Sequence, residues 1–418
     1  MRALVTDRSR VPDGLYRRFV RRAQVEGRLA DHLYAGEPYL ALNAIAIAPD
    51  ESARLARLTG VFSRVFDRAA SRLAGDVSRL QELGFPWVAA ELLSAEQPRV
   101  PVVGRFDWLQ DVAGRWWLLE FNADTPSGLR EAMVADRLVH ELLPEARGLA
   151  RPSDGLADRV AEEVARAMEG LPGDQTLGLV TDAGELEDLS QMAFTRDVLK
   201  EPLARRNTVV ALGDVDNLRR TSDGLALGRQ LLGALYRYYP FESMLGLPAF
   251  AAIYEAVAEG KLRLLNGLYG LLLQHKGLIA WLWEHRNDSD FSTEERAAIR
   301  DHLPPTRGIA DDPAEIEGPV VIKQVFGREG EEVFFSEDLL ADDWTTLRQR
   351  RTYVVQQRIA VAELDAVVWS STGPRIQRGH VTVGSFAVGG EFAGYYSRFG
   401  SKIITARAKW LATLVGGE

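Results

Sequence analysis

Residues 101–128, PVVGRFDWLQDVAGRWWLLEFNADTPSG, constrain the fold of this chain more than any other segment, because they predict a hairpin with a polar face. Side chains on a strand alternate between its two faces. Arg105 and Asp107 are therefore expected on one face of the first strand. The same alternation predicts a shared face for four residues of the second strand, which are Trp116, Leu118, Glu120 and Asn122.

The turn of this hairpin decides which side chains meet. A two-residue turn at residues 113–114, Ala-Gly, would place Asp107 opposite Glu120 and Arg105 opposite Asn122. A slightly different turn would shift this register, so the pairing is a hypothesis.

Two carboxylates that face each other across a sheet repel, so a compensating positive charge is expected. Magnesium prefers oxygen ligands and leaves positions for phosphate oxygens, and Asn122 adds a neutral oxygen on the same face. The alternative is that Arg105 neutralises the two acids on a solvated surface. Bulky apolar residues flank the polar face, which favours a magnesium site formed by Asp107, Glu120 and Asn122.

The hydrophobic periodicity divides the 418 residues into helix-rich and strand-rich parts, so we expect an α+β fold. Residues 1–99 are mainly helical in pattern, with an apolar stripe at Leu55, Leu58, Phe62, Val65, Phe66, Ala69 and Leu73. Helical patterns at 132–143, 156–168, 189–199 and 251–285 alternate with strand patterns at 100–123, 176–181 and 207–212. From residue 318 onward strand patterns dominate, and residues 288–313 are charged, as in a connector or a mobile lid.

We divide the chain into a helical region (1–99), the hairpin and following helices (100–175), a small α/β substrate subdomain (176–250) and a nucleotide-binding region (251–418).

Composition excludes several functions. The chain carries a formal net charge of −9, which argues against nucleic-acid binding, and it has no cysteine, which excludes disulfides, thiolate metal sites and a cysteine nucleophile. The N-terminus does not resemble a signal peptide, and the most apolar region, residues 264–283, is interrupted by polar residues. We therefore expect a cytoplasmic protein that does not bind membranes, and a homo-oligomer is compatible with the sequence.

A second candidate site is the segment GPVVIKQVFGREGEEVFF, which predicts a strand, a glycine-containing loop and a second strand. Lys323 lies on the first strand, while Gly327, Arg328 and Gly330 lie in the loop. Glycine allows backbone amides to approach a phosphate closely, and the basic side chains offset its charge. There is no GxxxxGK[ST] or GxGxxG motif, so those phosphate-binding classes lack support.

Three further segments contain candidate residues. Lys276 interrupts an apolar helix, either as a ligand-binding residue or as a lysine that extends from a core helix to solvent. Gln356 and Gln357 lie on opposite faces of the strand YVVQQRIAV, which is suited to line an adenine site. Arg398 follows a strand of small and aromatic residues, which favours a role in a site.

An acidic pair, Glu187 and Asp188, follows the apolar run at residues 176–181. The carboxyl ends of strands in open α/β sheets tend to bind ligands, so these acids are candidates for holding a cationic amine. Equally, they are suited to stabilise the start of the following helix. Both interpretations stay open at this point.

Taken together, these segments resemble the synthetase domain of glutathionylspermidine synthase, a member of the ATP-grasp ligases. The resemblance covers roughly residues 101–405 and rests on GRFDW, LLEFNADTPSG, TDAGELED, YPFESM, LLLQHKGLIAWLW, VVIKQVFGREG, YVVQQRIAV, GSFAVGGEFAGYYSRF and IIT, in that order. The acids precede the lysines, as in the circularly permuted ATP-grasp fold of this family, with its small pre-ATP-grasp-like α/β subdomain and helical N-terminal region.

The resemblance implies roles for individual residues. It implies magnesium ligation by Asp107, Glu120 and Asn122, and contacts of Lys276 and Lys323 with ATP phosphates. Arg328 would lie on a closing loop, and Arg105 and Arg398 would stabilise the acyl phosphate and the tetrahedral intermediate. Thr125 and Ser127 would hold the acid substrate, and Glu187 and Asp188 would attract a polyamine.

The implied activity is the joining of a small-molecule carboxylic acid to an amine with ATP and Mg²⁺. The larger members of the family carry a cysteine amidase domain, for which this chain has neither the cysteine nor the length. The segment LRLLNGLYG replaces the tryptophan-rich acidic segment that usually precedes Lys276, so we expect a different acid and amine. The rival interpretations are an ATP-grasp ligase that activates a carboxylate for a non-polyamine nucleophile, a catalytically silent nucleotide-binding protein, and a purely structural α+β protein.

Overall fold

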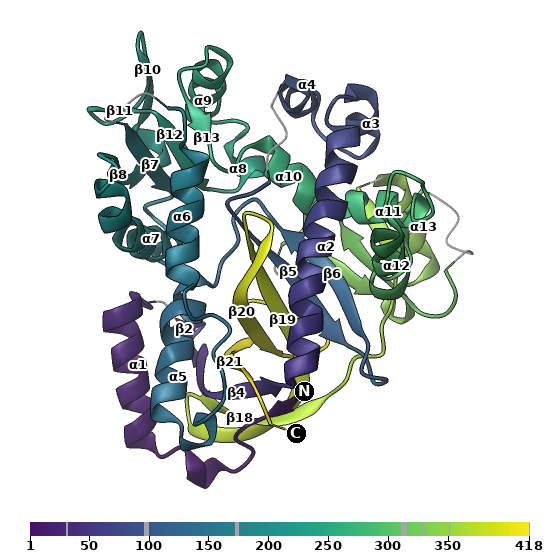
Figure 1. Ribbon diagram of the computed structural model, residues 1–418. Coiled ribbons are helices and arrows are strands. Elements are labelled where there is room, and N and C mark those ends of the chain that lie inside the picture. Colours follow the sequence, from purple (N-terminus) through teal and green to yellow (C-terminus); the bar gives the residue numbers. More distant parts are fainter. Residues whose placement is uncertain are drawn as a thin grey trace.

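The centre of the molecule is an eight-stranded sheet, in which the strand order is β1-β4-β21-β20-β19-β5-β6 and β18 pairs with β19. The computed structural model describes residues 1–30, 32–95, 100–171, 175–310, 316–328, 330, 332–350 and 352–417. The strands of this sheet are β1 (Arg2–Ala3), β4 (Leu40–Ile47), β5 (Val103–Gln110), β6 (Trp116–Asn122), β18 (Leu364–Ser370), β19 (Gly373–Val388), β20 (Glu391–Gly400) and β21 (Lys409–Val415). Because β21 pairs in parallel with β4, the two ends of the chain lie close together (Figure 1).

Helices cover both faces of the large sheet. The helix α2 (Pro49–Leu73) crosses one face, and the apolar stripe expected from the sequence is buried against it. On the other face pack α1 (Asp13–Gly27), the π-helical turn η2 (Glu131–Ala135), α5 (Asp136–Leu142) and α6 (Leu156–Ala167). Strand β4 is buried along its whole length because both of its faces are covered. This strand was not predicted, because residues 1–99 are mainly helical in pattern.

A small parallel sheet, β13-β12-β7-β8, forms the α/β unit expected from the sequence. Its elements are β7 (Thr176–Thr181), α7 (Leu186–Ala204), β8 (Val209–Asp214), β12 (Ala234–Tyr238) and β13 (Arg263–Leu264). A three-stranded antiparallel sheet of β9 (Leu218–Thr221), β10 (Gly224–Leu227) and β11 (Gln230–Leu232) lies beside it, with α8 (Phe241–Met244) and α9 (Pro248–Ala258). Strands β7 and β8 are parallel, so they need the crossover helix α7 between them.

A third sheet, here named the lysine sheet, has the order β14-β17-β15-β16. Its strands are β14 (Thr306–Gly308), β15 (Val320–Gln324), β16 (Val333–Phe335) and β17 (Tyr353–Gln357), flanked by α13 (Ala341–Arg350). Its buried apolar residues form a separate small core of Ile309, Ile316, Val320, Ile322, Leu347, Tyr353 and Val355. Figure 1 shows this sheet at the right, beside the helices α11 (Lys276–Glu284) and α12 (Thr293–His302).

Residues 288–313 are not an irregular connector throughout. They contain α12, which begins with a capping box between Ser292 and Glu295, and strand β14. Residues 311–313 lie outside the described residues. The domain boundaries drawn from the sequence stay predictions, and strands from residues 1–99, 100–175 and 251–418 all enter the one large sheet.

The hairpin β5–β6 confirms the expected pairs but corrects the expected turn. Asp107 faces Glu120 and Arg105 faces Asn122, as the sequence predicts. The turn, however, closes through a hydrogen bond from Gly114 N to Asp111 O, so the ladder next to it is shifted by one residue. A bulge at Leu119 then restores the expected register, because Trp108 pairs with Leu118 while Asp107 pairs with Glu120.

The bulge also corrects the expected shared face of the second strand. Trp116 and Leu118 belong to the core beneath α2, whereas Glu120 lines a cavity on the opposite side. Strict alternation does not hold across an extra residue, and for this reason the four side chains do not share one face.

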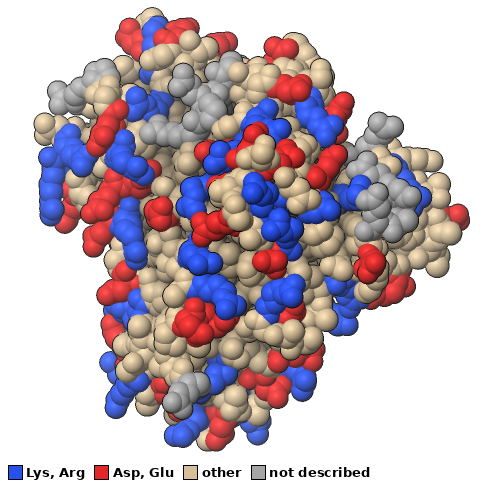
Figure 2. Space-filling model, turned by 45° about the vertical axis from the view of Figure 1, so that its right-hand side comes forward, with Lys and Arg blue, Asp and Glu red and all other residues tan. Residues whose placement is uncertain are grey.

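The remaining elements include α3 (Val77–Glu82), α4 (Trp87–Ala95), β2 (Leu33–Tyr34), β3 (Glu37–Pro38) and α10 (Leu268–Gln274), of which α10 is buried in the largest core. None of the helices in the described part of the chain combines the length and apolar character needed to cross a membrane. On the face that Figure 2 shows, acidic and basic side chains are interspersed, as is typical of a solvated exterior.

Candidate functional site

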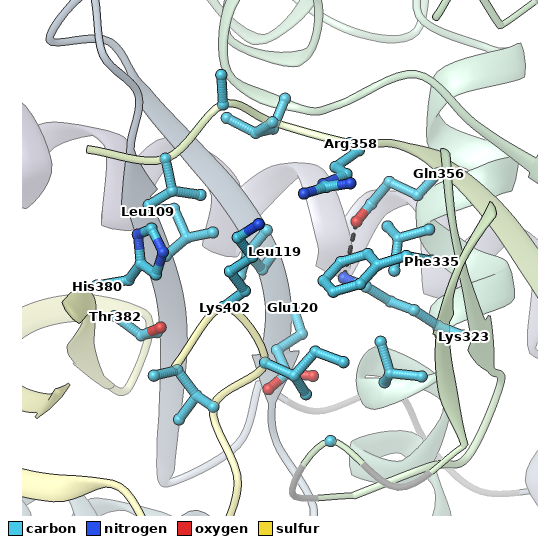
Figure 3. Close-up of a pocket in the computed structure, with 18 of the residues that line it drawn as sticks. Leu109, Leu119, Glu120, Lys323, Phe335, Gln356, Arg358, His380, Thr382 and Lys402 are labelled. Atoms are coloured by element: carbon cyan, nitrogen blue, oxygen red, sulfur yellow. Dashed lines mark hydrogen bonds between the residues drawn. The ribbon is translucent and has the colours of Figure 1, made fainter. Parts of the chain in front are cut away.

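A cavity of about 690 Å³ lies between the large sheet and the lysine sheet. Its size falls within the range of small-molecule sites. Figure 3 shows Lys323, Phe335 and Gln356 on one side and Leu109, His380 and Thr382 on the other. Eight residues singled out in the sequence line it, namely Glu120, Lys276, Lys323, Gly327, Gly330, Gln356, Gln357 and Arg398.

Lys276 is the first residue of α11, after the chain breaks between α10 and α11 at His275. Its side chain is buried, and its Nζ lies 2.6 Å from the carbonyl oxygen of Gly327 and 3.5 Å from Oε2 of Glu120. The alternative of a lysine extending to solvent is therefore wrong. The break in the helix lets the ammonium turn inward, toward both the glycine loop and the hairpin.

Lys323 lies on β15, diagonally across from Gln356 on β17. Its Nζ donates a hydrogen bond of 2.8 Å to Oε1 of Gln356. Burial lowers the pKa of Lys323 to about 8, and the charge of Glu120 opposes this shift. Gln357 faces the other way, and its side-chain amide donates to the carbonyl oxygen of Glu317.

Asp107 is held by two arginines. Arg105 binds it in a bidentate manner, with Nε to Oδ1 at 2.7 Å and an Nη to Oδ2 at 3.0 Å. Arg398 approaches from β20, where its Nη lies 3.4 Å from Oδ2. Arg105 also donates to the backbone oxygen of Ser127 at 2.7 Å, and its guanidinium lies 4.8 Å from the ring centre of Tyr396. The structure thus brings Arg105, Asp107, Ser127 and Arg398 together.

Glu120 stays ionised despite its surroundings. Burial would raise the pKa of its carboxyl, but the positive charges of Lys276, Lys323, Arg398 and Arg105 together hold that pKa below its usual value. An anionic carboxylate beside an anionic Asp107 is a suitable oxygen pair for a hard cation. The basic side chains around the pair outnumber the acids, which leaves the site net positive.

The oxygen donors fit Mg²⁺. Among the residues that the structure describes, no group of three or more His, Asp or Glu side chains is arranged to hold a metal ion. A magnesium ion here would therefore need the amide oxygen of Asn122 and phosphate oxygens besides Asp107 and Glu120. Arg105 occupies one lone-pair direction on each Asp107 oxygen and Arg398 a second one on Oδ2, which leaves about one of the four directions of the carboxylate for a cation.

Arg328 lies outside the cavity lining. Its guanidinium donates to Oδ2 of Asp124 at 2.8 Å, to Oγ1 of Thr125 at 2.9 Å and to Glu242 at 2.6 Å. It therefore joins the glycine loop to the end of β6 and to α8. Thr125 is drawn into this cluster, while Ser127 contacts Arg105.

The glycine loop packs against the connection between β20 and β21. Gly330 has a φ of +76°, which favours glycine, and a Cβ there would come within 2.8 Å of Ile403 Cγ2 and 2.9 Å of Ile404 O. Ile403, Ile404 and Lys402 line the same cavity. This close approach requires glycine on steric as well as conformational grounds.

Glu187 and Asp188 lie in the first turn of α7, away from the cavity lining. Burial raises the pKa of Tyr39, and Glu187 adds to that shift; Asp188 and Glu187 act in the same way on Tyr238. The Tyr39 hydroxyl lies 2.7 Å from the Tyr396 hydroxyl, beside Arg105. The position of the acidic pair at a helix start suits the stabilising role.

Sequence reasoning missed several lining residues, including Phe335, Arg358, His380, Thr382 and Lys402. Alternation could have found two of them, because Thr382 and His380 lie two residues apart and share a face of β19. Thr382 pairs with Leu109 on one neighbouring strand and with Arg398 on the other. Asp124 was also missed. It is fully buried between Arg237 and Arg328, and the positive charges of these arginines outweigh burial and lower its pKa.

Comparison with known proteins identifies the family of the chain. A protein of Haemophilus influenzae described as "Putative acid--amine ligase" is 24% identical over 276 residues, and the match covers 63% of this chain. This chain spans about 64% of the length of that curated relative. The solved apo structure of a glutathione synthetase-like effector from Globodera pallida has a TM-score of 0.69 at 12% identity, covering 99% of each chain, which shows a shared fold. The family described as "Glutathionylspermidine synthase preATP-grasp" matches residues 22–416, so the chain belongs to that family.

Proposed function

We propose that this chain is an ATP- and magnesium-dependent ligase that joins a carboxylic acid to an amine through an acyl phosphate, releasing ADP and phosphate. One observation carries the proposal. Two lysines and an arginine from three separate segments line one cavity together with Glu120, and the arginine also contacts the buried Asp107 that faces Glu120 across the hairpin. The cavity is large enough for a nucleotide.

The charges in the cavity suit a nucleoside triphosphate. Lys276, Lys323 and Arg398 are positioned to contact phosphate oxygens, while the apolar part of the wall, with Val321, Phe335 and Ile359, suits a purine base. Asp107, Glu120 and Asn122 would hold Mg²⁺, which offsets charge on the phosphoryl group when bound. Catalysis of phosphoryl transfer consists chiefly of such positioning and charge compensation.

The order of bond changes follows from the chemistry. A carboxylate oxygen of the acid attacks the γ-phosphorus of ATP, the bond to the bridging oxygen breaks, and ADP leaves. The amine nitrogen then attacks the acyl carbon, and inorganic phosphate leaves as the nitrogen loses a proton. Arg105 and Arg398 would stabilise the oxyanion of the second step, and their common contact with Asp107 supports this role.

The acid substrate is assigned to the region around Arg105. Ser127 contacts Arg105, and Thr125 contacts Arg328, so the turn after β6 lies between the two arginines. With Arg328 held by Asp124 and Glu242, the glycine loop covers this region and would keep water from the acyl phosphate. A cationic amine would approach from the side of Glu187 and Asp188.

Screening tests the proposal directly. Pairs of carboxylic acids and amines, including polyamines, are incubated with ATP and Mg²⁺, and ADP release is measured together with the mass of the product. We expect ADP release that requires both substrates and a product lighter than their sum by one water. Glu120→Gln serves as the control that binds substrates but turns over poorly. Tight ATP binding with no coupled product across the panel would favour a catalytically silent nucleotide-binding protein.

A further inference from the structure

A buried chain of hydrogen bonds leads from Lys323 away from the cavity. The Lys323 ammonium donates to Oε1 of Gln356 at 2.8 Å, and Nε2 of Gln356 donates to Oγ1 of Thr306 at 3.0 Å. The Thr306 hydroxyl donates to the carbonyl oxygen of Pro304 at 2.8 Å. Thr306 is 1% exposed and Gln356 2% exposed, so water does not compete for these bonds.

The direction of this chain is fixed by Thr306. A hydroxyl has a single proton, and here that proton goes to Pro304. Thr306 can therefore only accept from Gln356, which must present its NH₂ group to Thr306 and its carbonyl oxygen to Lys323. A flipped amide would place two acceptors together at Thr306 and would direct an NH₂ group at an ammonium.

The β-sheet positions the three side chains for this role. Thr306 pairs directly with Gln356 across β14 and β17, and Gln356 is diagonal to Lys323 across β17 and β15. Cross-strand and diagonal neighbours are within contact distance on one face of a sheet. Lys323 and Gln356 line the cavity, whereas Thr306 does not.

We propose that Thr306 is a positioning residue for nucleotide binding, which acts by fixing the amide of Gln356 so that its carbonyl oxygen holds the Lys323 ammonium in the cavity. The proposal rests on the proposed function only in that ATP is the ligand. It reassigns Gln356 from a direct contact with the base to a residue that acts through Lys323. Burial favours loss of the lysine proton, and the Gln356 carbonyl favours the charged form, so the acceptor also helps to keep the lysine cationic.

The test compares Thr306→Val with Thr306→Ser by calorimetry of ATP binding. Valine has nearly the shape of threonine but cannot accept the Gln356 hydrogen bond, whereas serine can. We expect Thr306→Val to weaken ATP affinity about three- to tenfold, and Thr306→Ser to stay within about twofold of wild type. Thermal unfolding of both variants shows that the protein is folded.

A double-mutant cycle separates this role from a merely structural one. In a Lys323→Met background the ammonium is absent, so Thr306→Val should have no further effect on ATP affinity. If Thr306→Val weakens ATP binding equally in both backgrounds, or not at all while Lys323→Met does, the proposal is overturned. If wild type itself fails to bind ATP, it is the proposed function that fails.

Discussion

The two walls of the cavity are built differently. The wall that carries Asp107 and Glu120 is part of an eight-stranded sheet, and its far side packs on α2 within the largest hydrophobic core. The wall that carries Lys323 is a four-stranded sheet with a small core of its own, and α13 is its helical cover. A small core gives a lower local stability, so the lysine sheet is expected to move more easily than the large sheet.

This difference in expected mobility suits two different tasks, which are holding a metal ion and admitting a nucleotide. The carboxylates, which would need a fixed geometry to hold a metal ion, lie on the wall with the larger core, which is expected to move less. Of the three cations that would contact a nucleotide, Lys323 lies on the lysine sheet and Lys276 contacts its glycine loop, whereas Arg398 lies on β20 of the large sheet. The two walls meet at few points, among them Lys276 with Glu120 and the backbone bond from Val112 N to Ala360 O. The comparison predicts distinct effects for changes on each wall.

Changes to the fixed wall are expected to have the largest effect. Asp107→Asn or Glu120→Gln should lower turnover about a hundred- to a thousandfold or more, because charge compensation on the phosphoryl group is lost. The fold should persist, since the backbone pairing of β5 and β6 does not involve these side chains. Initial rates of ADP release and thermal unfolding measure both effects. Wild-type turnover in either variant would remove the magnesium assignment.

Changes to the two lysines that line the cavity should act on ATP binding. Lys276→Met and Lys323→Met should each weaken ATP binding about ten- to a hundredfold, the range for a lost charge-assisted hydrogen bond. Calorimetry with ATP measures the loss. A matched control is Lys261→Met, at an exposed lysine paired with Glu259, which should bind ATP normally. Normal affinity in both cavity variants would contradict the assignment of this wall.

Amide hydrogen exchange tests directly whether the lysine sheet is less stable than the large sheet. Without nucleotide, amides in β14, β15 and β17 should exchange faster than those in β4, β19 and β20. A nucleotide at about ten times its dissociation constant should slow exchange in the lysine sheet about tenfold and leave the centre of the large sheet almost unchanged. Mass spectrometry of peptides resolves the two sheets. Equal exchange in both would show that the walls do not differ in stability.

The small α/β unit does not line the cavity, and its proposed role in binding the amine is testable through Glu187 and Asp188. Replacing both with amides should raise the KM for the amine about three- to tenfold while the KM for ATP stays near wild type. The effect should shrink as salt rises, because screening weakens attraction between exposed charges. If the acids serve only to stabilise the start of α7, the same variant would instead lose thermal stability and keep its amine KM.

The smallest expected effect concerns Asp136 in α5, which does not line the cavity. Burial raises the pKa of its carboxyl to about 7, although Arg151 and the amide of Thr413 oppose this. The folded state thus retains a proton that the unfolded chain releases near pH 4. The stability from this group is fully present below about pH 4 and is lost as pH rises through about 7.

Asp136→Asn should therefore flatten the fall in unfolding free energy between pH 5 and pH 8. Denaturant unfolding at these two pH values measures the slope. The control is Asp154→Asn, which removes an exposed partner of the same Arg151 and should keep the wild-type slope. An unchanged slope in Asp136→Asn would show that this carboxyl titrates normally in the folded protein.

The sequence predicted much of the local structure, because strands and amphipathic helices follow from hydrophobic period. The strands β5, β6, β15, β17, β19 and β20 and the stripe of α2 all appear where expected. It could not predict which sheets these strands join, since the pairing of β4 with β21 links residues at opposite ends of the chain. His380 and Thr382 were also missed, although alternation along β19 places them on one face, because their position in the cavity depends on the pairing of β19 with β5 and β20.

Individual site residues show the same limit. The inward direction of Lys276 depends on a helix break at His275 that the apolar pattern did not reveal. Arg328 was expected at the reacting groups, but its strongest partners are Asp124 and Glu242, which come from distant segments. Local pattern identifies candidate residues, whereas their partners are set by tertiary packing.

Because of the bulge at Leu119, the two parts of the hairpin differ in how well they tolerate insertions and deletions. Leu119 and Glu120 are adjacent yet both line the cavity, which a regular strand does not allow. The adjacent residues Leu119 and Glu120 thus supply an apolar side chain and a charge side by side. On the turn side of the bulge, an added or lost residue can be taken up in the loop at residues 111–115. Between Glu120 and Asn122 nothing absorbs such a change, and a single deletion there would direct Asn122 into the core. We expect relatives of this chain to vary in length before Leu119 and to keep a fixed spacing after it.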